Sequence, residues 1–182
     1  MHQSMKHVGL VRKKLGVRTI FNLLGPLCNP AGACYQLLGV GIPEIRPLMA
    51  GALQKLGTKR ALVVSGEDGM DEVSLAGSTD VSEVSVDGST EFAWNPVVFG
   101  VEISSDTNGM LAETPAESAA VIRGILDGEK GSARDIVVLN SAAALWLGGK
   151  QNNPVKCAKL ASNAIDDGAA KELLAKLAQK SS

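Results

Sequence analysis

The sequence is poor in aromatic residues and cysteine, and it lacks any long apolar run. Phe, Trp and Tyr make up 3% of its 182 residues, so the core must be built from Leu, Val, Ile and Ala. Cys28, Cys34 and Cys157 are odd in number and show no Cys-x-x-Cys spacing, which indicates reduced thiols in a cytoplasmic protein, not a disulfide framework or a zinc site. No apolar run approaches membrane-spanning length and no signal-peptide pattern follows Met1, so we expect no membrane segment.

The sequence also lacks an excess of charge of one sign. Its 18 basic and 19 acidic residues give a net charge of −1, which offers no basis for a nucleic-acid partner, since such proteins are usually clearly basic. Apolar residues make up 45% of the chain, as in globular proteins. We therefore expect one domain over residues 1–182 with a substantial core.

A loop rich in carboxylates directly follows a short apolar run. Ala61–Val64 is too short for a helix and is typical of a buried strand, and the next eight residues carry two glycines and four carboxylates. A buried strand that ends in such a loop is where an open α/β sheet presents ligand-binding groups. Adjacent carboxylates suit Mg²⁺, which keeps several waters and often takes other ligands from substrate phosphates. A solvated surface loop would have the same composition, so both interpretations stand at this point.

The residues around that strand predict a β-α-β unit. Residues 35–40 form an apolar strand pattern, Pro43 is suited to the first position of a helix, and Gly57 marks its end. The strand at Ala61–Val64 follows, so the two strands should run parallel with a right-handed crossover.

A hairpin and a helical region complete the prediction. Residues 79–86 and 89–94 flank Asp87-Gly88, a hairpin turn signal. Capped, glycine-terminated helices are expected from Thr114 onward, and Asn153-Pro154 is expected to start one of them. The fold class is therefore α/β, with a mixed, mainly parallel sheet, an antiparallel hairpin and a cover of helices. Trp94 and Trp146 are expected to pack in the core.

Residues 1–18 are basic and contain both histidines, His2 and His7. The segment can be a solvated amphipathic helix, exposed or loosely held. It can also face an anion, because arginine offers a planar fork that matches carboxylate and phosphate. Pattern alone leaves both interpretations open. Further along, Gly25-Pro26 and Asn29-Pro30 predict loops, because proline disfavours a helical conformation in the residue before it.

Several segments have a distinctive order and spacing. They are His2-Gln3-Ser4-Met5-Lys6-His7-Val8, Val11-Arg12, the run from Gly16 to Leu27, Asn29-Pro30, and the Gly-x-x-Gly-x-Asp-Glu pattern of residues 66–72. Together they resemble anthranilate phosphoribosyltransferase, and the resemblance continues weakly through residues 139–145. It favours the metal interpretation of the acidic loop.

The resemblance implies transfer of a phosphoribosyl group from phosphoribosyl diphosphate to anthranilate, a Mg²⁺-dependent step of tryptophan biosynthesis. It places Asp71 and Glu72 at the magnesium bound to the diphosphate. Arg12 would meet the anthranilate carboxylate, with His2 nearby, and Pro26 would form an apolar wall. No catalytic acid or base is assigned, because a positioned amine is already a competent nucleophile. Glu67 and Asp68 would be either supporting or solvated groups, with solvation favoured.

Full-length members of that family begin with a helical domain that carries a Gly-Thr-Gly-Gly-Asp type diphosphate loop, and this sequence has no such loop. We therefore expect the large α/β domain of a two-domain enzyme, similar to that of nucleoside phosphorylases and phosphoribosyltransferases. Alone it should be weakly active or inactive, and its partner would be a separate helical domain or a second copy. The alternatives are a pyrimidine nucleoside phosphorylase-like enzyme and a non-catalytic relative or subunit of a split enzyme.

Overall fold

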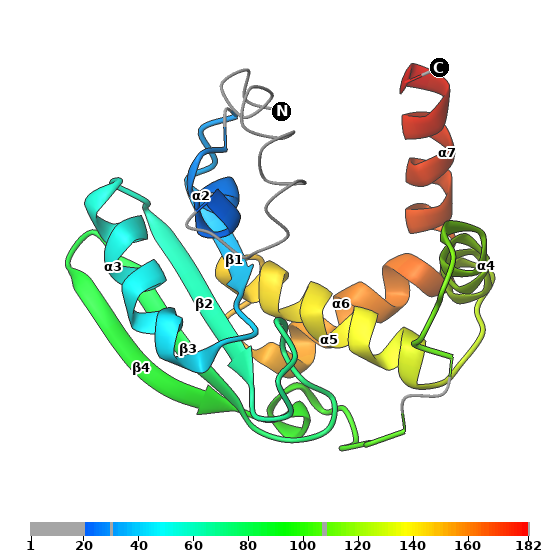
Figure 1. Cartoon of the computed structure of the whole chain (residues 1–182). Helices are drawn as coiled ribbons and strands as arrows, with labels where there is room; N and C mark the ends of the chain where they lie inside the picture. The colour runs from blue at the N-terminus through cyan, green and yellow to red at the C-terminus, as the bar shows by residue number, and fades with distance from the viewer. Residues whose placement is uncertain (1–20, 30, 107–108, 182) are drawn as a thin grey trace.

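A computed structural model of the chain describes residues 21–29, 31–106 and 109–181 (Figure 1). His2, Arg12 and the rest of the predicted basic segment 1–18 lie outside the described residues. The helices and strands follow in chain order: α2 (Phe21–Leu27), β1 (Tyr35–Gly39), the 3-10 turn η1 (Pro43–Ile45), α3 (Arg46–Lys55), β2 (Arg60–Gly66), β3 (Thr79–Ser85), β4 (Gly88–Trp94), the 3-10 turn η2 (Pro96–Phe99), α4 (Pro115–Leu126), α5 (Ser132–Leu147), α6 (Pro154–Asp166) and α7 (Ala169–Ser181).

The strands pair in chain order, β1-β2-β3-β4. β1 runs parallel to β2, with Leu37 opposite Leu62, whereas β3 is antiparallel to both β2 and β4. The predicted mixed sheet, β-α-β unit and hairpin are confirmed. "Mainly parallel" needs correction, because only the β1–β2 pair is parallel in the described part. The chain leaves β2 through a loop and returns without a crossover helix, so β3 must run antiparallel.

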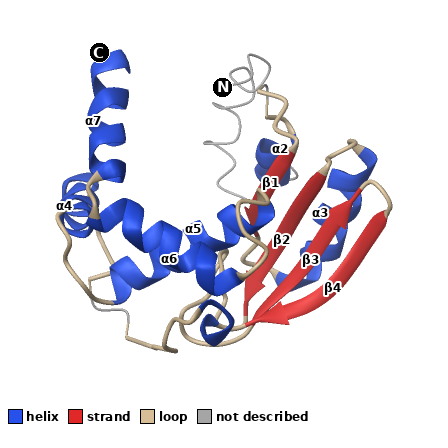
Figure 2. Ribbon diagram, turned by 180° about the vertical axis from the view of Figure 1, so that it is seen from behind, coloured by secondary structure: helices blue, strands red, loops and turns tan. Residues whose placement is uncertain are grey.

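Helices cover both faces of the sheet, as Figures 1 and 2 show from opposite sides. Alternate residues of β2 face opposite ways: Ala61 and Val63 pack with Met49 and Leu53 of α3. The other face of the sheet packs against α5 and α6 in a second cluster, whose fully buried members include Leu62, Val64, Val81, Leu139 and Ala143. Because both faces are covered, β2 is apolar along most of its length.

The predicted helix starts at Thr114 and Asn153 are confirmed. The side-chain oxygen of Thr114 accepts a hydrogen bond from the Glu117 N–H, and that of Asn153 accepts one from the Lys156 N–H. Proline follows each cap at the first helical position, where its missing N–H costs no hydrogen bond. These caps fix where α4 and α6 begin.

The prediction of a loop at Gly25-Pro26 is wrong, because both residues lie in α2. Proline breaks a helix by removing an N–H and by crowding the carbonyl four residues earlier. α2 is only seven residues long and ends one residue after Pro26. Pro26 therefore costs this short helix only the hydrogen bond to the Asn22 carbonyl, four residues earlier. The loop predicted at Asn29 is confirmed.

Four of the six aromatic residues of the chain gather in one cluster. Trp94, which is 6% exposed, meets Phe92, Phe99 and Trp146 edge-on, with ring centroids 5.3, 5.0 and 5.3 Å away. Edge-to-face contacts of this kind stabilise a core beyond the area that they bury. The predicted core role is confirmed for Trp94, whereas Trp146 is only partly buried and packs against the core.

The C-terminal helix α7 contrasts with these elements. None of its residues is buried, and both views show it projecting away from the body of the molecule. No helix within the described ranges is both long enough and apolar enough to span a membrane.

Candidate metal and substrate site

The acidic loop joins β2 to β3 at the carboxyl ends of the two parallel strands. β2 ends at Gly66, and the backbone of Asp71 packs directly against Gly39, the last residue of β1. Gly41 lies against the same loop, because a Cβ at Gly41 would be 3.5 Å from the carbonyl oxygen of Gly69. In an open α/β sheet this is the edge at which ligands bind.

Hydrogen bonds inside the loop set its shape. The N–H of Gly66 donates to the Met70 carbonyl at 2.9 Å. The Asp68 carboxylate accepts from the Ser74 hydroxyl at 2.7 Å and from the Met70 N–H at 3.2 Å. Gly69 has a φ of +86°, a conformation that glycine adopts without strain. Asp68 is exposed to solvent, and its two hydrogen bonds also stabilise the loop.

Helix α5 anchors the far end of the loop through Asn140. Its amide oxygen accepts from the N–H of Val73 at 2.8 Å, and its amide nitrogen donates to the Val73 carbonyl at 2.9 Å. The same nitrogen donates to the Ile136 carbonyl at 3.1 Å. Sequence reasoning did not single out Asn140, and the weak resemblance over residues 139–145 was the only signal there.

The carboxylates of the loop repel one another. Asp71 is exposed and Glu72 is half-buried. Burial raises the pKa of Glu72 above its ordinary value, and the nearby negative charges of Asp71 and Asp68 raise that pKa further. Each of these effects disfavours a second negative charge. A bound cation would relieve the repulsion.

The donor set fits Mg²⁺. Asp71 and Glu72 supply hard oxygen ligands on adjacent residues, and Mg²⁺ is usually held by one or two carboxylates, waters and substrate phosphates. Within residues 21–29, 31–106 and 109–181, no group of three or more His, Cys, Asp or Glu side chains is arranged to hold a metal. Two carboxylates would supply only part of a Mg²⁺ coordination shell.

Comparison with known proteins identifies the family. Residues 1–171 match the family model described as "Glycosyl transferase family, a/b domain". The chain belongs to this family. Relatives within it include the anthranilate phosphoribosyltransferase of Desulfitobacterium hafniense strain Y51, 46% identical over 97% of this chain and 52% of that protein. The enzyme of the same name from Rhodopirellula baltica is 45% identical over 98% of this chain and 52% of that protein.

Solved structures of anthranilate phosphoribosyltransferases are also similar to this chain. Anthranilate phosphoribosyltransferase from Thermus thermophilus superposes with a TM-score of 0.85 and 42% identity, over 96% of this chain and 51% of that one. The Saccharomyces cerevisiae enzyme, solved in complex with PRPP and Mg, gives 0.83 and 28% identity, over 94% and 49%. The predicted resemblance is confirmed, and the chain spans about half the length of the curated relatives it matches.

The predicted site residues of this family member are only partly brought together. Asp71 and Glu72 are consecutive residues of the loop, and the backbone of Asp71 lies against the end of β1. Pro26 lies by the start of β1, where its carbonyl accepts a hydrogen bond from the Gln36 side chain at 2.9 Å. The structure therefore separates Pro26 from the acidic pair by most of the length of this strand.

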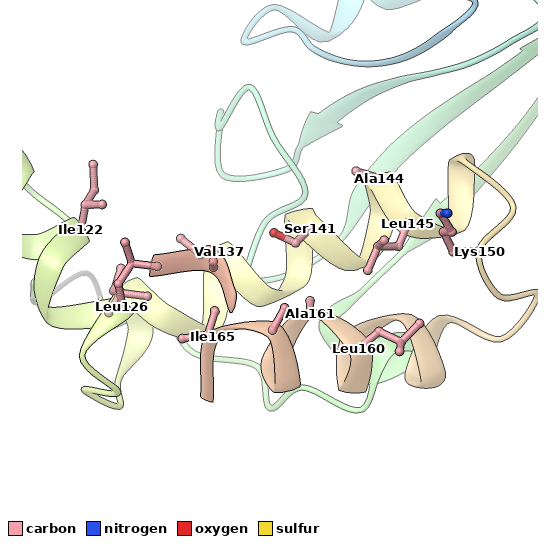
Figure 3. Close-up of a pocket in the computed structure, with 13 residues that line it drawn as sticks. Ile122, Leu126, Val137, Ser141, Ala144, Leu145, Lys150, Leu160, Ala161 and Ile165 are labelled. Atoms are coloured by element: carbon pink, nitrogen blue, oxygen red, sulfur yellow. The ribbon is translucent and has the colours of Figure 1, made fainter. Parts of the chain in front are cut away.

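An apolar cavity of about 750 Å³ lies apart from the acidic loop, among the helices α4, α5 and α6 (Figure 3). Ile122, Val137 and Leu160 line it from three different helices, and no carboxylate lines it. Apart from Ser141 and Lys150 the lining is apolar, so it offers no ligands to a metal ion.

Proposed function

We propose that this chain takes part in transferring a phosphoribosyl group from phosphoribosyl diphosphate to the amino group of anthranilate. The observation that carries the proposal is the Asp71-Glu72 pair at the carboxyl end of β2. It lies in a chain whose relatives are anthranilate phosphoribosyltransferases, one of them solved with PRPP and Mg. The names of these relatives favour anthranilate over the pyrimidine nucleoside acceptor considered above.

Asp71 and Glu72 are the residues that would hold Mg²⁺. When bound, the ion neutralises the negative charge that develops on the departing diphosphate. The protein contributes by presenting both carboxylates on a loop that is braced by Asp68 and anchored by Asn140. Two carboxylates held in advance at the metal site do not have to be ordered when substrate arrives, which favours binding.

Arg12, His2 and Pro26 are proposed to form the acceptor side. The guanidinium group of Arg12 can make two parallel hydrogen bonds to the anthranilate carboxylate, while Pro26 offers an apolar surface to the ring. The anthranilate amine needs only to be positioned for attack, so no further general base is proposed. The resemblance of residues 2–30 to the family supports these roles.

The partners of this site are also proposals. Because the chain spans about half the length of its relatives, the remaining diphosphate and ribose contacts are assigned to a helical domain or to a second copy of this chain. The free thiols of Cys28 and Cys34 are exposed, which supports the reducing environment of the cytoplasm.

Calorimetric titrations of the purified chain test the proposal. Phosphoribosyl diphosphate is titrated with and without Mg²⁺, and anthranilate is titrated separately, into the wild type, Asp71→Asn and Arg12→Ala. We expect Asp71→Asn to lose only the Mg²⁺-dependent binding and Arg12→Ala to lose only anthranilate binding. Unchanged binding in both variants would refute the assigned roles. Turnover of anthranilate by the chain alone, at a rate normal for an enzyme, would contradict the expected weak activity.

A further inference from the structure

Asn140 joins helix α5 to the acidic loop through a pair of reciprocal hydrogen bonds. Both the N–H and the carbonyl of Val73 are bonded to the same side-chain amide, at 2.8 and 2.9 Å. Val73 directly follows Glu72 in the chain. Two bonds to one residue fix the direction of its backbone, as pairing in a sheet would.

The amide of Asn140 is itself held in one orientation. Its nitrogen donates to the carbonyls of both Val73 and Ile136, while its oxygen accepts from an N–H. A flipped amide would place the oxygen against two carbonyls. The adjacent Leu139 is fully buried in the core, so the helix beneath the amide is held as well. Asparagine is the residue of this size that can both donate and accept here.

Asp71 and Glu72 lie between two backbone positions that are held by hydrogen bonds. On one side, the hydrogen bond from Gly66 to the Met70 carbonyl closes the loop at 2.9 Å. On the other side, Asn140 holds Val73. Asp71 and Glu72 lie between these points, and their mutual repulsion favours a wider separation when no cation is present. The anchor at Val73 opposes that separation.

We propose that Asn140 is a positioning residue for the metal site: by fixing the backbone of Val73, it holds Asp71 and Glu72 where both carboxylates reach one divalent cation. The inference rests on the proposed function, since that function supplies the reason for the cation. It concerns residues of this chain alone and is read out by ion binding, without turnover. Residues that hold metal ligands in place typically change metal affinity by about 10–100-fold when they are replaced.

The test uses Mn²⁺ as the probe, because free Mn²⁺ is counted by electron paramagnetic resonance. In Asn140→Asp the side chain keeps its shape but loses the two donated hydrogen bonds. The variant also adds a negative charge close to the loop, and charge alone would tighten cation binding. The inference predicts the opposite, an affinity about tenfold weaker. Asn140→Ala, which removes the anchor without adding charge, should weaken Mn²⁺ binding in the same way.

Two controls separate positioning from general stability. Asn163→Asp makes the same substitution on an exposed site of α6 and should leave Mn²⁺ affinity within about twofold, because exposed charges at a distance are screened. Val73→Ala removes a fully buried side chain but keeps the backbone groups that bond Asn140. It should lower the melting temperature and leave Mn²⁺ affinity unchanged. All affinities are compared at a temperature where far-ultraviolet circular dichroism shows each variant folded.

The outcomes distinguish the two proposals. If the wild type binds Mn²⁺ and Asp71→Asn does not, but Asn140→Asp and Asn140→Ala bind as tightly as the wild type, the positioning role is wrong and the metal site stands. If Val73→Ala loses affinity as much as Asn140→Ala, the effect is general destabilisation and the positioning role is again wrong. If Asp71→Asn binds as the wild type does, the proposed function loses its metal site.

Discussion

The backbone carbonyl of Asp71 occupies the space that a side chain on Gly39 would need. A Cβ built on Gly39 would lie 1.4 Å from that oxygen, far inside any van der Waals contact. The end of β1 and the acidic loop can therefore meet only because residue 39 is glycine. This close approach ties the parallel strand pair to the candidate metal site.

Gly39→Ala is expected to destabilise the protein and to displace the loop. Because the clash is with backbone, which cannot rotate away, the loss should be about 1–3 kcal/mol, as for other overpacked sites. Mn²⁺ affinity should fall in parallel, since Asp71 itself must move. Urea unfolding and the Mn²⁺ titration measure the two effects.

Gly51→Ala is the matched control. Gly51 lies within α3, and a Cβ there would meet nothing within 4 Å. Alanine is favoured over glycine in a helix, so this variant should gain roughly 0.5–1 kcal/mol with unchanged Mn²⁺ affinity. Equal losses of stability in the two variants would rule out the explanation by close approach.

Neighbouring residues of α5 should respond very differently to truncation. Leu139 is fully buried, whereas Val137 is 41% exposed. Leu139→Ala leaves a cavity in the core and should cost about 2–5 kcal/mol. Val137→Ala should stay within about 0.5 kcal/mol, as surface substitutions usually do. Urea denaturation of both variants checks the difference, and similar losses would contradict the assignment of the two faces of this helix.

The three thiols should fall into two reactivity classes. Cys28 and Cys34 are exposed, whereas Cys157 is buried. Burial raises the pKa of Cys157, and its thiol donates a hydrogen bond to the Gln151 carbonyl at 3.6 Å. With Ellman's reagent at about pH 8, Cys28 and Cys34 should react quickly. Cys157 should react at least on the order of 100-fold more slowly, because its thiol becomes accessible only when the structure around it opens locally. Cys157→Ala should remove only the slow phase; loss of a fast phase would contradict the assignment.

Asp166 gives the stability of the helical layer a defined pH dependence. Its carboxylate lies 2.9 Å from Nη2 of Arg134, whose side chain is 4% exposed. A hydrogen bond from Lys130 contributes most to lowering the pKa of Asp166, and the positive charge of Arg134 adds to it. The folded state therefore favours the ionised form. The stabilisation is complete above the ordinary value of 3.8 and is lost as pH falls through the lower folded value.

Asp166→Asn should accordingly lower the melting temperature at about pH 6, because it leaves the Arg134 charge without its anionic partner. The difference between wild type and variant should shrink as the pH falls below about 4. Melting curves across that range measure it. A difference that stays constant, or that grows in acid, would show that the charge of Asp166 is not the cause.

Much of the fold could be predicted from short-range patterns. The apolar run at Ala61–Val64, the turn at Asp87-Gly88 and the caps at Thr114 and Asn153 each specify local structure within a few residues. The helical conformation of Pro26 could not be predicted this way. The general penalty for proline in a helix does not reveal that this helix stops one residue later.

The candidate site shows the same limit. The acidic pattern Asp71-Glu72 was visible because the two carboxylates are adjacent in the chain. Asn140 is 67 residues away from its partner Val73, and an asparagine in the middle of a helix carries no signal of which backbone it will meet. Gly39 was likewise one of twenty glycines, and only the arrangement in space shows that it borders Asp71.

The strand order has a consequence for how the chain folds while it is being synthesised. Because β2, β3 and β4 each pair with the strand that precedes them in the described part of the chain, these strands can be added one after another as translation proceeds, with little searching for remote partners. Leu62, Val64 and Val81 then stay uncovered until α5 and α6 have been synthesised. That interval is when a nascent chain would need a chaperone most.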